Sequence, residues 1–170
     1  MENLTDNDLT TSSIPNIKPV EHVKLTHYDG KLREVSVIDD EFPYPEGELI
    51  ISRTDINGII THTNRAFVIL SGYSKEELIG QPHYILRHPS MPRAAFKDLW
   101  DTVLSGRKWN GYVKNLRKNG QFYWVYATIV PNFDQNKRIK GFTSVRRQPP
   151  REKINYCTKL YKEMLAKEKL

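Results

Sequence analysis

The stretch of residues 72–119 constrains the fold more than any other part of this 170-residue chain. It combines helix-capping serines, histidines, tryptophans and an asparagine, and runs typical of β-strands lie on both sides of it. A plain hydrophobic core has little use for polar and aromatic side chains crowded into one short segment. The stretch therefore indicates a small pocket built between short helices and a sheet.

Before this stretch the sequence predicts a β-hairpin. Residues 49–52 and 59–62 are rich in β-branched side chains, and Asn57-Gly58 between them supplies the positive φ angles of a tight turn. A second hairpin signal lies further towards the N-terminus, where two partly apolar runs within residues 23–38 flank Asp29-Gly30. Residues 1 to about 20 are polar and rich in turn formers, and we expect them to be disordered.

Capping signals predict the helices of the middle region. Asn64 caps a short helix that Gly72 ends, and Ser74 with Glu77 three residues later forms a capping box. Ser90, with a proline two residues on, opens the one long helix. Apolar residues recur along that helix at helical spacing, namely Phe96, Leu99, Trp100, Val103 and Leu104.

Three strands should follow, at residues 109–118, 122–130 and 139–147, and a final amphipathic helix begins near residue 151. Antiparallel strands with helices gathered between them predict an α+β fold, in which one face of a five-stranded antiparallel sheet carries the short helices. The expected organisation is an N-terminal extension (residues 1–45, a disordered tail and a hairpin), one domain (46–148) and a C-terminal helix (149–170).

Composition excludes several functional classes. The net charge of +6 comes from 26 basic and 20 acidic side chains that are interspersed, so the sequence does not predict nucleic-acid binding. The single cysteine, Cys157, forms no intrachain disulfide or cysteine-based metal site. The polar N-terminus is unlike a signal peptide and no apolar run is long enough to span a membrane. We expect a cytoplasmic protein without direct membrane insertion, recruited to the inner membrane only by a partner.

Catalytic signatures are missing from the sequence. It has no phosphate-binding glycine-rich loop and no nucleophile elbow, and His83 and His88 lack the i, i+4 spacing of a metal-binding pair. We therefore expect neither an enzyme nor a metal site.

Extended motifs resemble a known family. Residues 55–64 (DINGIITHTN) and 72–80 (GYSKEELIG) resemble a PAS domain, and the resemblance covers about residues 48–147. Within PAS domains, residues 81–83, 87–96, 99–100 and 109–120 resemble the sensor domain of bacterial aerotaxis receptors. The resemblance implies a flavin-binding redox or oxygen sensor with FAD as its cofactor. It also implies a set of cofactor-binding residues, namely Asn64, His83, Arg87, His88, Phe96, Trp100, Trp109 and Asn115.

The residues themselves support parts of this set. Phe96 and Trp100 lie four apart on the long helix and share a face, which favours either an aromatic wall for a flat ring or ordinary core packing. Asn115 lies in the middle of a strand, where asparagine is disfavoured, and the resemblance implies that its amide binds the flavin edge. Arg87 offers a fixed fork of donors suited to phosphate. A histidine before proline, as at His88, also caps turns.

Three departures from related domains refine the expectation. Ser90 stands where the receptor family often has aspartate, which changes the phosphate end of the site. Light-sensing flavin PAS domains carry a cysteine within the segment that corresponds to residues 80–86, whereas this chain has His83 there and its cysteine far away. No photoadduct is expected, and Val125 replaces a second flavin-binding asparagine of those light sensors.

The strand around Trp124 indicates where a signal leaves the domain. Alternation places Tyr123, Val125, Ala127 and Ile129 on the inner face and Trp124 and Tyr126 on the outer face. Trp124 and Tyr126 form either a partner-binding patch or a surface covered by the N-terminal hairpin or the terminal helix. The expected partner is a chemoreceptor-like membrane protein or a component of a histidine kinase pathway, with homodimerisation as an alternative.

Two other functions stay open from the sequence. A PAS module that fills its pocket with its own aromatics needs no cofactor and acts only by docking or dimerising. A heme-binding gas sensor would use His83 or His88 as an axial ligand.

Overall fold

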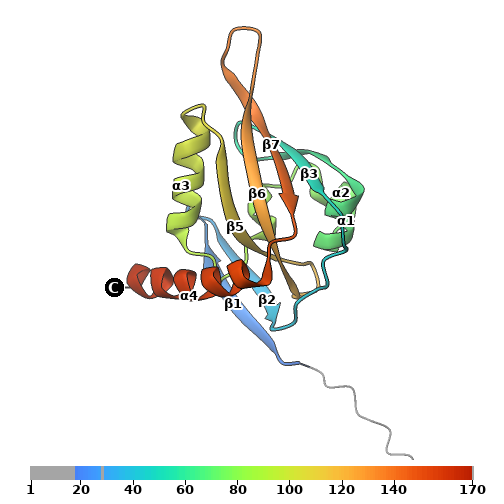
Figure 1. The fold of residues 1–170 in the computed structure, drawn as a ribbon, viewed down its shortest axis with the longest axis vertical. Coiled ribbons are helices and arrows are strands. Elements are labelled where there is room, and N and C mark those ends of the chain that lie inside the picture. Colours follow the sequence, from blue (N-terminus) through green and yellow to red (C-terminus); the bar gives the residue numbers. More distant parts are fainter. Residues whose placement is uncertain (1–17, 28, 170) are drawn as a thin grey trace, which may run out of the picture.

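Figure 1 shows the computed structural model, which describes residues 18–27 and 29–169. Within this part of the chain, the strands and helices follow one another in the predicted order. The elements are β1 (Val20–Thr26), β2 (Leu32–Ile38), β3 (Ile50–Asp55), β4 (Ile60–Thr63), α1 (Arg65–Ser71), α2 (Lys75–Leu78), the 3-10 helix η1 (His83–Leu86), α3 (Arg93–Leu104), β5 (Trp109–Leu116), β6 (Phe122–Phe133), β7 (Ile139–Arg147) and α4 (Arg151–Glu168).

The central sheet has the strand order β4-β3-β7-β6-β5, and all its pairs are antiparallel. The prediction of an α+β fold with a five-stranded antiparallel sheet is therefore confirmed. In the turn between β3 and β4 only Gly58 has a positive φ, of 78°. The Asp55 carboxylate completes this turn by accepting the backbone N–H groups of Asn57 and Ile59.

Local capping signals explain the first two helices. The Asn64 side chain accepts the backbone N–H of Phe67 at the start of α1, and Gly72 ends the helix with a φ of 75°. Ser74 and Glu77 form the predicted capping box of α2. These interactions satisfy backbone N–H groups that have no partner inside the helix.

The start of α3 was predicted wrongly. Pro92 immediately precedes the helix, and Ser90 does not cap it. The Ser90 hydroxyl lies 2.8 Å from Nδ1 of His88 instead, and its backbone N–H donates to the same nitrogen at 3.1 Å. The apolar face of α3 is narrower than predicted, because Leu104 is 52% exposed.

The hairpin of β1 and β2 lies outside the central sheet, at the predicted place. Leu25 and Val35 from its inner face pack against Leu116 at the end of β5. The Arg33 guanidinium donates to the carbonyl of Ile85 in η1 at 2.6 Å. Residues 1–17 of the predicted disordered tail lie outside the described residues.

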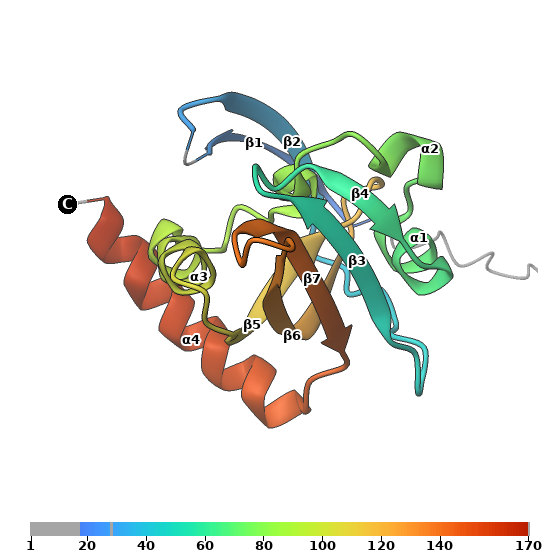
Figure 2. The same cartoon turned by 90° about the horizontal axis from the view of Figure 1, so that it is seen from above.

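Helix α4 crosses the outer face of the sheet, and the view from above in Figure 2 shows it on the opposite side of the sheet from α1 and α2. Trp124 packs against Ile154 and Cys157, and the Tyr161 hydroxyl donates to the carbonyl of Tyr112 at 2.6 Å. Trp124 is only 5% exposed. Of the alternatives that the sequence left open for Trp124, a partner-binding patch or a surface covered by another element, the structure has the second, with the terminal helix as the cover.

Candidate ligand-binding site

A cavity lies between the inner face of the sheet and the helices η1 and α3. Its volume is about 110 Å³. One water molecule needs roughly 10–15 Å³ of such space, so the cavity has room for a ligand group much larger than water. Side chains from β3, β5, β6 and β7 form one wall, and η1 and α3 form the other. Five of the predicted cofactor-binding residues line it, namely His83, Arg87, Phe96, Trp100 and Asn115.

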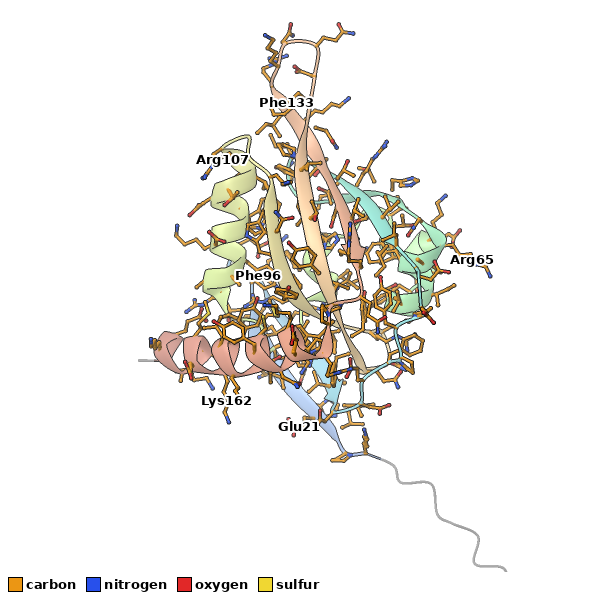
Figure 3. All side chains as sticks on the ribbon, in the orientation of Figure 1. Glu21, Arg65, Phe96, Arg107, Phe133 and Lys162 are labelled. Atoms are coloured by element: carbon orange, nitrogen blue, oxygen red, sulfur yellow. The ribbon has the colours of Figure 1, made fainter. Side chains whose placement is uncertain are left out.

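The helical wall is aromatic. Phe96 and Trp100 both face the cavity from α3, as their spacing predicted. The Trp100 ring meets Phe142 of β7 edge-on, with ring centroids 5.5 Å apart and planes at 80°. Figure 3 shows Phe96 on the end of α3 that lies nearest α4. A flat slot lined by aromatic rings is the kind of surface that stacks on a planar conjugated ligand.

The sheet wall is built from smaller side chains. Val113, Val125 and Ala127 line the cavity, and Gly111 pairs with Ala127 across β5 and β6. The predicted inner face of β6 is therefore confirmed. Small residues on these strands leave the space that bulky ones would fill.

Asn115 is a buried amide in this wall. It lies in β5, is 4% exposed, and faces Tyr123 across the strand pair. Its backbone also forms a bridge to Arg87, just after η1. Burial raises the pKa of Tyr123 to about 12, so its phenol is neutral. Asn115 therefore presents an amide beside a neutral phenol in this wall.

A polar cluster that the sequence did not single out lies on the central strands. Arg146 of β7 is 2% exposed, and its Nη2 donates to Oγ of Ser52 at 2.5 Å. Its Nη1 lies 3.3 Å from Nε2 of His83, and its guanidinium lies 4.5 Å from the centre of the Phe67 ring. Arg146, Ser52 and His83 all line the cavity.

The charge of Arg146 is uncompensated in the described part of the chain. No carboxylate there lies within 4.0 Å of it, and its Nε is buried without a hydrogen-bond partner. Burial lowers the pKa of Arg146 to about 10, which still leaves the side chain charged at neutral pH. A buried cation without a counter-charge is costly, so this wall favours a ligand with an electron-rich edge.

His83 is neutral beside this cation. Burial, and then the charge of Arg146, lowers the pKa of His83 to about 3. Its Nε2 lies between the Ser52 hydroxyl, at 3.4 Å, and the Arg146 guanidinium. The imidazole can therefore accept a hydrogen bond from Arg146 and help to hold it in place.

The other end of the cavity is cationic as well. Arg87 is 7% exposed, and its Nη1 and Nη2 donate to the carbonyls of Thr26 and Met91. Its guanidinium lies 5.0 Å from the centre of the Phe96 ring, and its Nε has no partner among the described residues. Arg93, at the start of α3, lines the same end. Two guanidinium groups here fit an anionic group of a ligand.

Three predicted site residues lie away from the cavity lining. The Asn64 amide is used by the backbone of α1 and β3. Trp109 packs over Gly111, and its indole N–H donates to Asp98 of α3 at 2.9 Å, so it ties α3 to β5. His88 packs edge-on against Phe122, with ring centroids 6.1 Å apart.

Ser52, Arg93 and Arg146 were the residues that sequence reasoning missed. The signal for Arg146 was present, because alternation along β7 places it on the same face as Phe142 and Ser144. An arginine at an inward position of a central strand is unusual enough to mark a site. Arg93 carried no such signal, since arginines in the first turn of a helix are usually exposed.

Among residues 18–27 and 29–169, no group of three or more histidine, cysteine, aspartate or glutamate side chains has the arrangement to hold a metal ion. No helix in that part of the chain is long and apolar enough to cross a membrane.

Comparison with known proteins agrees with this architecture. A family model described as PAS fold matches residues 60–146. The chain is 45% identical to the aerotaxis receptor of Escherichia coli (strain K12) over 130 residues, which are 76% of this chain and 26% of that receptor. It is 28% identical to the nitrogen fixation regulatory protein of Klebsiella pneumoniae over 102 residues, which are 60% of this chain and 21% of that protein. The chain thus spans about a quarter of the length of these relatives or less.

Solved structures show the same fold. The PAS domain of a protein from Colwellia psychrerythraea is 31% identical with a TM-score of 0.51, and the match covers 59% of this chain and 86% of that one. The dark structure of the blue-light photoreceptor Aureochrome1 LOV is 20% identical with a TM-score of 0.58, covering 70% and 86%.

Proposed function

Because the chain belongs to the PAS fold family, we propose that it is a flavin-binding sensor domain that reports redox state or oxygen, with FAD as its cofactor. The observation that supports this proposal most is a cavity with an aromatic wall on one side and, on the other, the charge of Arg146, which has no carboxylate partner within the described residues. The motif resemblance to aerotaxis receptors and the 45% identity to one of them support the same assignment.

The lining residues fit the parts of a flavin nucleotide. Phe96 and Trp100 would stack on the ring, and the buried amide of Asn115 would bind its polar edge. Arg87, with one unpartnered nitrogen, and Arg93 would bind the phosphate end.

A bound flavin supplies a ring whose charge changes when it takes up electrons. Arg146 stabilises negative charge at the cavity wall, and neutral His83 together with Ser52 keeps its guanidinium in place. A gain of negative charge in the cavity strengthens the pull on Arg146 and weakens its bond to Ser52 on β3. The rearrangement therefore begins on the central strands, whose outer face carries α4.

Light-driven adduct chemistry is not part of this proposal. Cys157, the only cysteine, lies on the outer face of the sheet against Trp124, whereas the cavity lies on the inner face. Burial also raises the pKa of the Cys157 thiol, which reduces its reactivity. Non-enzymatic redox sensing is the function that these groups support.

The output partner belongs to the same proposal. The E. coli relative is named as an aerotaxis receptor, and we infer that this domain signals to a chemoreceptor-like membrane protein or to a histidine kinase pathway. Self-association as a homodimer is the alternative. The domain would then work in the cytoplasm and reach the inner membrane through its partner.

Absorption spectroscopy of the full chain tests the proposal. We expect flavin bands in the purified protein and release of FAD on denaturation. Trp100→Ala and Asn115→Ala should each weaken flavin binding about tenfold, or about 1.4 kcal/mol, because each removes a direct ring contact. Asn110→Ala is the matched control, since Asn110 lies on the same strand but bonds to Thr128 at an exposed position.

Other outcomes point to the other functions. Protein that is colourless after expression with ample riboflavin would indicate a cofactor-free interaction module, and a Soret band would indicate heme. Unchanged flavin binding in both alanine variants would contradict the assignment of the site.

A further inference from the structure

The last residue of helix α4, Glu168, contacts Arg93, which lines the cationic end of the cavity. The carboxylate accepts the backbone N–H of Ala94 at 2.9 Å, and its second oxygen lies 3.7 Å from Nε of Arg93. Ala94 and Arg93 form the first turn of α3, whose amino-terminal end carries partial positive charge. A side chain 74 residues away in sequence thus binds the start of the helix that forms the aromatic wall.

Arg87 belongs to the same electrostatic cluster. Burial lowers the pKa of Arg87, the charge of Glu168 opposes this shift and the charge of Arg93 adds to it, so the three groups lie close enough to interact. Only 7% of the Arg87 surface is exposed to solvent. Its Nε has no hydrogen-bond partner in residues 18–27 and 29–169. A buried donor left unsatisfied at the cavity lining indicates room for an acceptor from a ligand.

We propose that Glu168 is a carboxylate that α4 supplies to this end of the cavity and that competes there with the phosphate of a flavin nucleotide. The ligand class rests on the proposed function. Carboxylate and phosphate are both anions that bind backbone N–H groups at helix ends and guanidinium donors. Two anions at the start of α3 would repel each other, so either the phosphate or the Glu168 carboxylate occupies that position.

The competition couples the cavity to α4 in both directions. A ligand with a phosphate displaces Glu168 and frees the end of α4, and docking of α4 weakens the binding of that ligand by the same factor. A ligand without phosphate binds the ring slot and leaves α4 in place. Glu168 thus discriminates between ligands that share one ring.

Binding of FMN and of riboflavin to the ligand-free full chain tests this role, because riboflavin lacks the phosphate. In Glu168→Gln the side chain keeps its size and loses its charge. We expect this variant to bind FMN roughly three- to tenfold more tightly than the unmodified protein, with riboflavin affinity unchanged. Glu163→Gln is the matched control, an exposed glutamate on the same helix.

Hydrogen exchange reads the reverse direction of the coupling. FMN should speed exchange of the amides in the last turn of α4, whereas riboflavin should not. In Glu168→Gln these amides should exchange fast from the start and respond to neither ligand. A structural role of Glu168 alone would not separate the two ligands.

The outcomes separate this inference from the proposed function. If both flavins bind and Glu168→Gln changes neither affinity, or both equally, the competition is wrong although the flavin site stands. If neither of these flavins nor FAD binds, the proposed function fails, and inorganic pyrophosphate then tests the competition without a ring. Tighter pyrophosphate binding by Glu168→Gln supports it, and equal binding overturns it.

Discussion

The single residue Arg146 shows how a side chain that suits a binding site can lower the stability of the fold. A buried guanidinium with hydrogen bonds but no carboxylate partner among the described residues carries a desolvation penalty that attraction does not offset. Replacing buried charges by apolar side chains of similar volume often stabilises proteins. The side chain is therefore better explained by what the cavity binds than by the fold.

Replacing Arg146 with methionine should separate these two effects. We expect Arg146→Met to raise the free energy of unfolding of the ligand-free protein by about 1–2 kcal/mol, since Ser52 and His83 can still bond to each other. The same variant should lose at least about tenfold in flavin affinity. Urea denaturation and flavin titration measure the two quantities.

Arg53→Met provides the comparison, because Arg53 is an exposed arginine on β3 of the same sheet. It should change neither quantity by more than about 0.5 kcal/mol. An Arg146→Met protein that is less stable and still binds flavin normally would show that Arg146 serves the fold.

Individual site residues were predictable where spacing, an unusual position or a family motif marked them. Helical spacing placed Phe96 and Trp100 on one face and left core packing open, and the family resemblance favoured the aromatic wall. Asn115 was marked by an amide in mid-strand. Arg146 was overlooked because arginines are usually read as surface residues. His88 matched a motif, yet its Nδ1 is engaged by Ser90, a contact that depends on the local turn.

Among the helices and strands, the sequence predicted those whose ends are determined by residues close to them in the chain. Asn64, Gly72 and the Ser74–Glu77 capping box act within a few residues, so their helices could be placed correctly. The target of α4 was left as one of two alternatives, because it depends on which outer-face residues of the sheet come together. Amphipathicity predicts that a helix has a partner and does not say which one.

Docking of α4 should depend on the Tyr161 hydroxyl. Tyr161→Phe removes the 2.6 Å hydrogen bond to the Tyr112 carbonyl, which should cost about 1 kcal/mol. Because α4 leaves the sheet more often, its amides should exchange about fivefold faster. Hydrogen exchange followed by mass spectrometry measures this change.

Tyr156→Phe on the same helix is the control, since the Tyr156 side chain is 64% exposed. Its exchange should match that of the unmodified protein. Equal protection of α4 in Tyr161→Phe would mean that apolar packing of Trp124 and Ile154 alone holds the helix.

The molecule as a whole should be sensitive to mild acid. Burial lowers the pKa of His27, and lowers those of His83 and His88 to about 3. These histidines take up protons near pH 6.5 only when the chain unfolds, so stability is complete above that pH and is lost as the pH falls towards 3. Surface carboxylates with lowered pKa values, such as Asp40, also contribute stability, and that contribution is lost only at still lower pH.

We expect the free energy of unfolding to fall between pH 6.5 and 5 by up to about 1.4 kcal/mol per pH unit for each histidine that stays neutral in the fold. Urea midpoints at pH 7, 6 and 5 measure the slope. His88→Asn should make it shallower, whereas His62→Asn, at an exposed position, should not. An identical slope for His88→Asn would show that His88 is protonated in the folded protein.

The two elements added to the central sheet converge on one end of the cavity. The hairpin reaches Arg87 through the Thr26 carbonyl, and α4 reaches the start of α3 through Glu168. The chain thus surrounds the cationic end with segments from both sides of the PAS core. Motifs within the core predicted the cavity, and only the assembled molecule shows which added segments contact the residues at its cationic end.

Because Cys157 is buried between α4 and the sheet, the rate at which its thiol is alkylated should measure how often α4 leaves the sheet. The thiol is 4% exposed against Trp124, and it is the only cysteine in the chain. A maleimide can alkylate it only while α4 is lifted, so the labelling rate counts these openings without an introduced dye or tag. Measuring the labelling rate of Cys157 in the oxidised and in the reduced protein would therefore show directly whether a change in redox state alters the docking of α4.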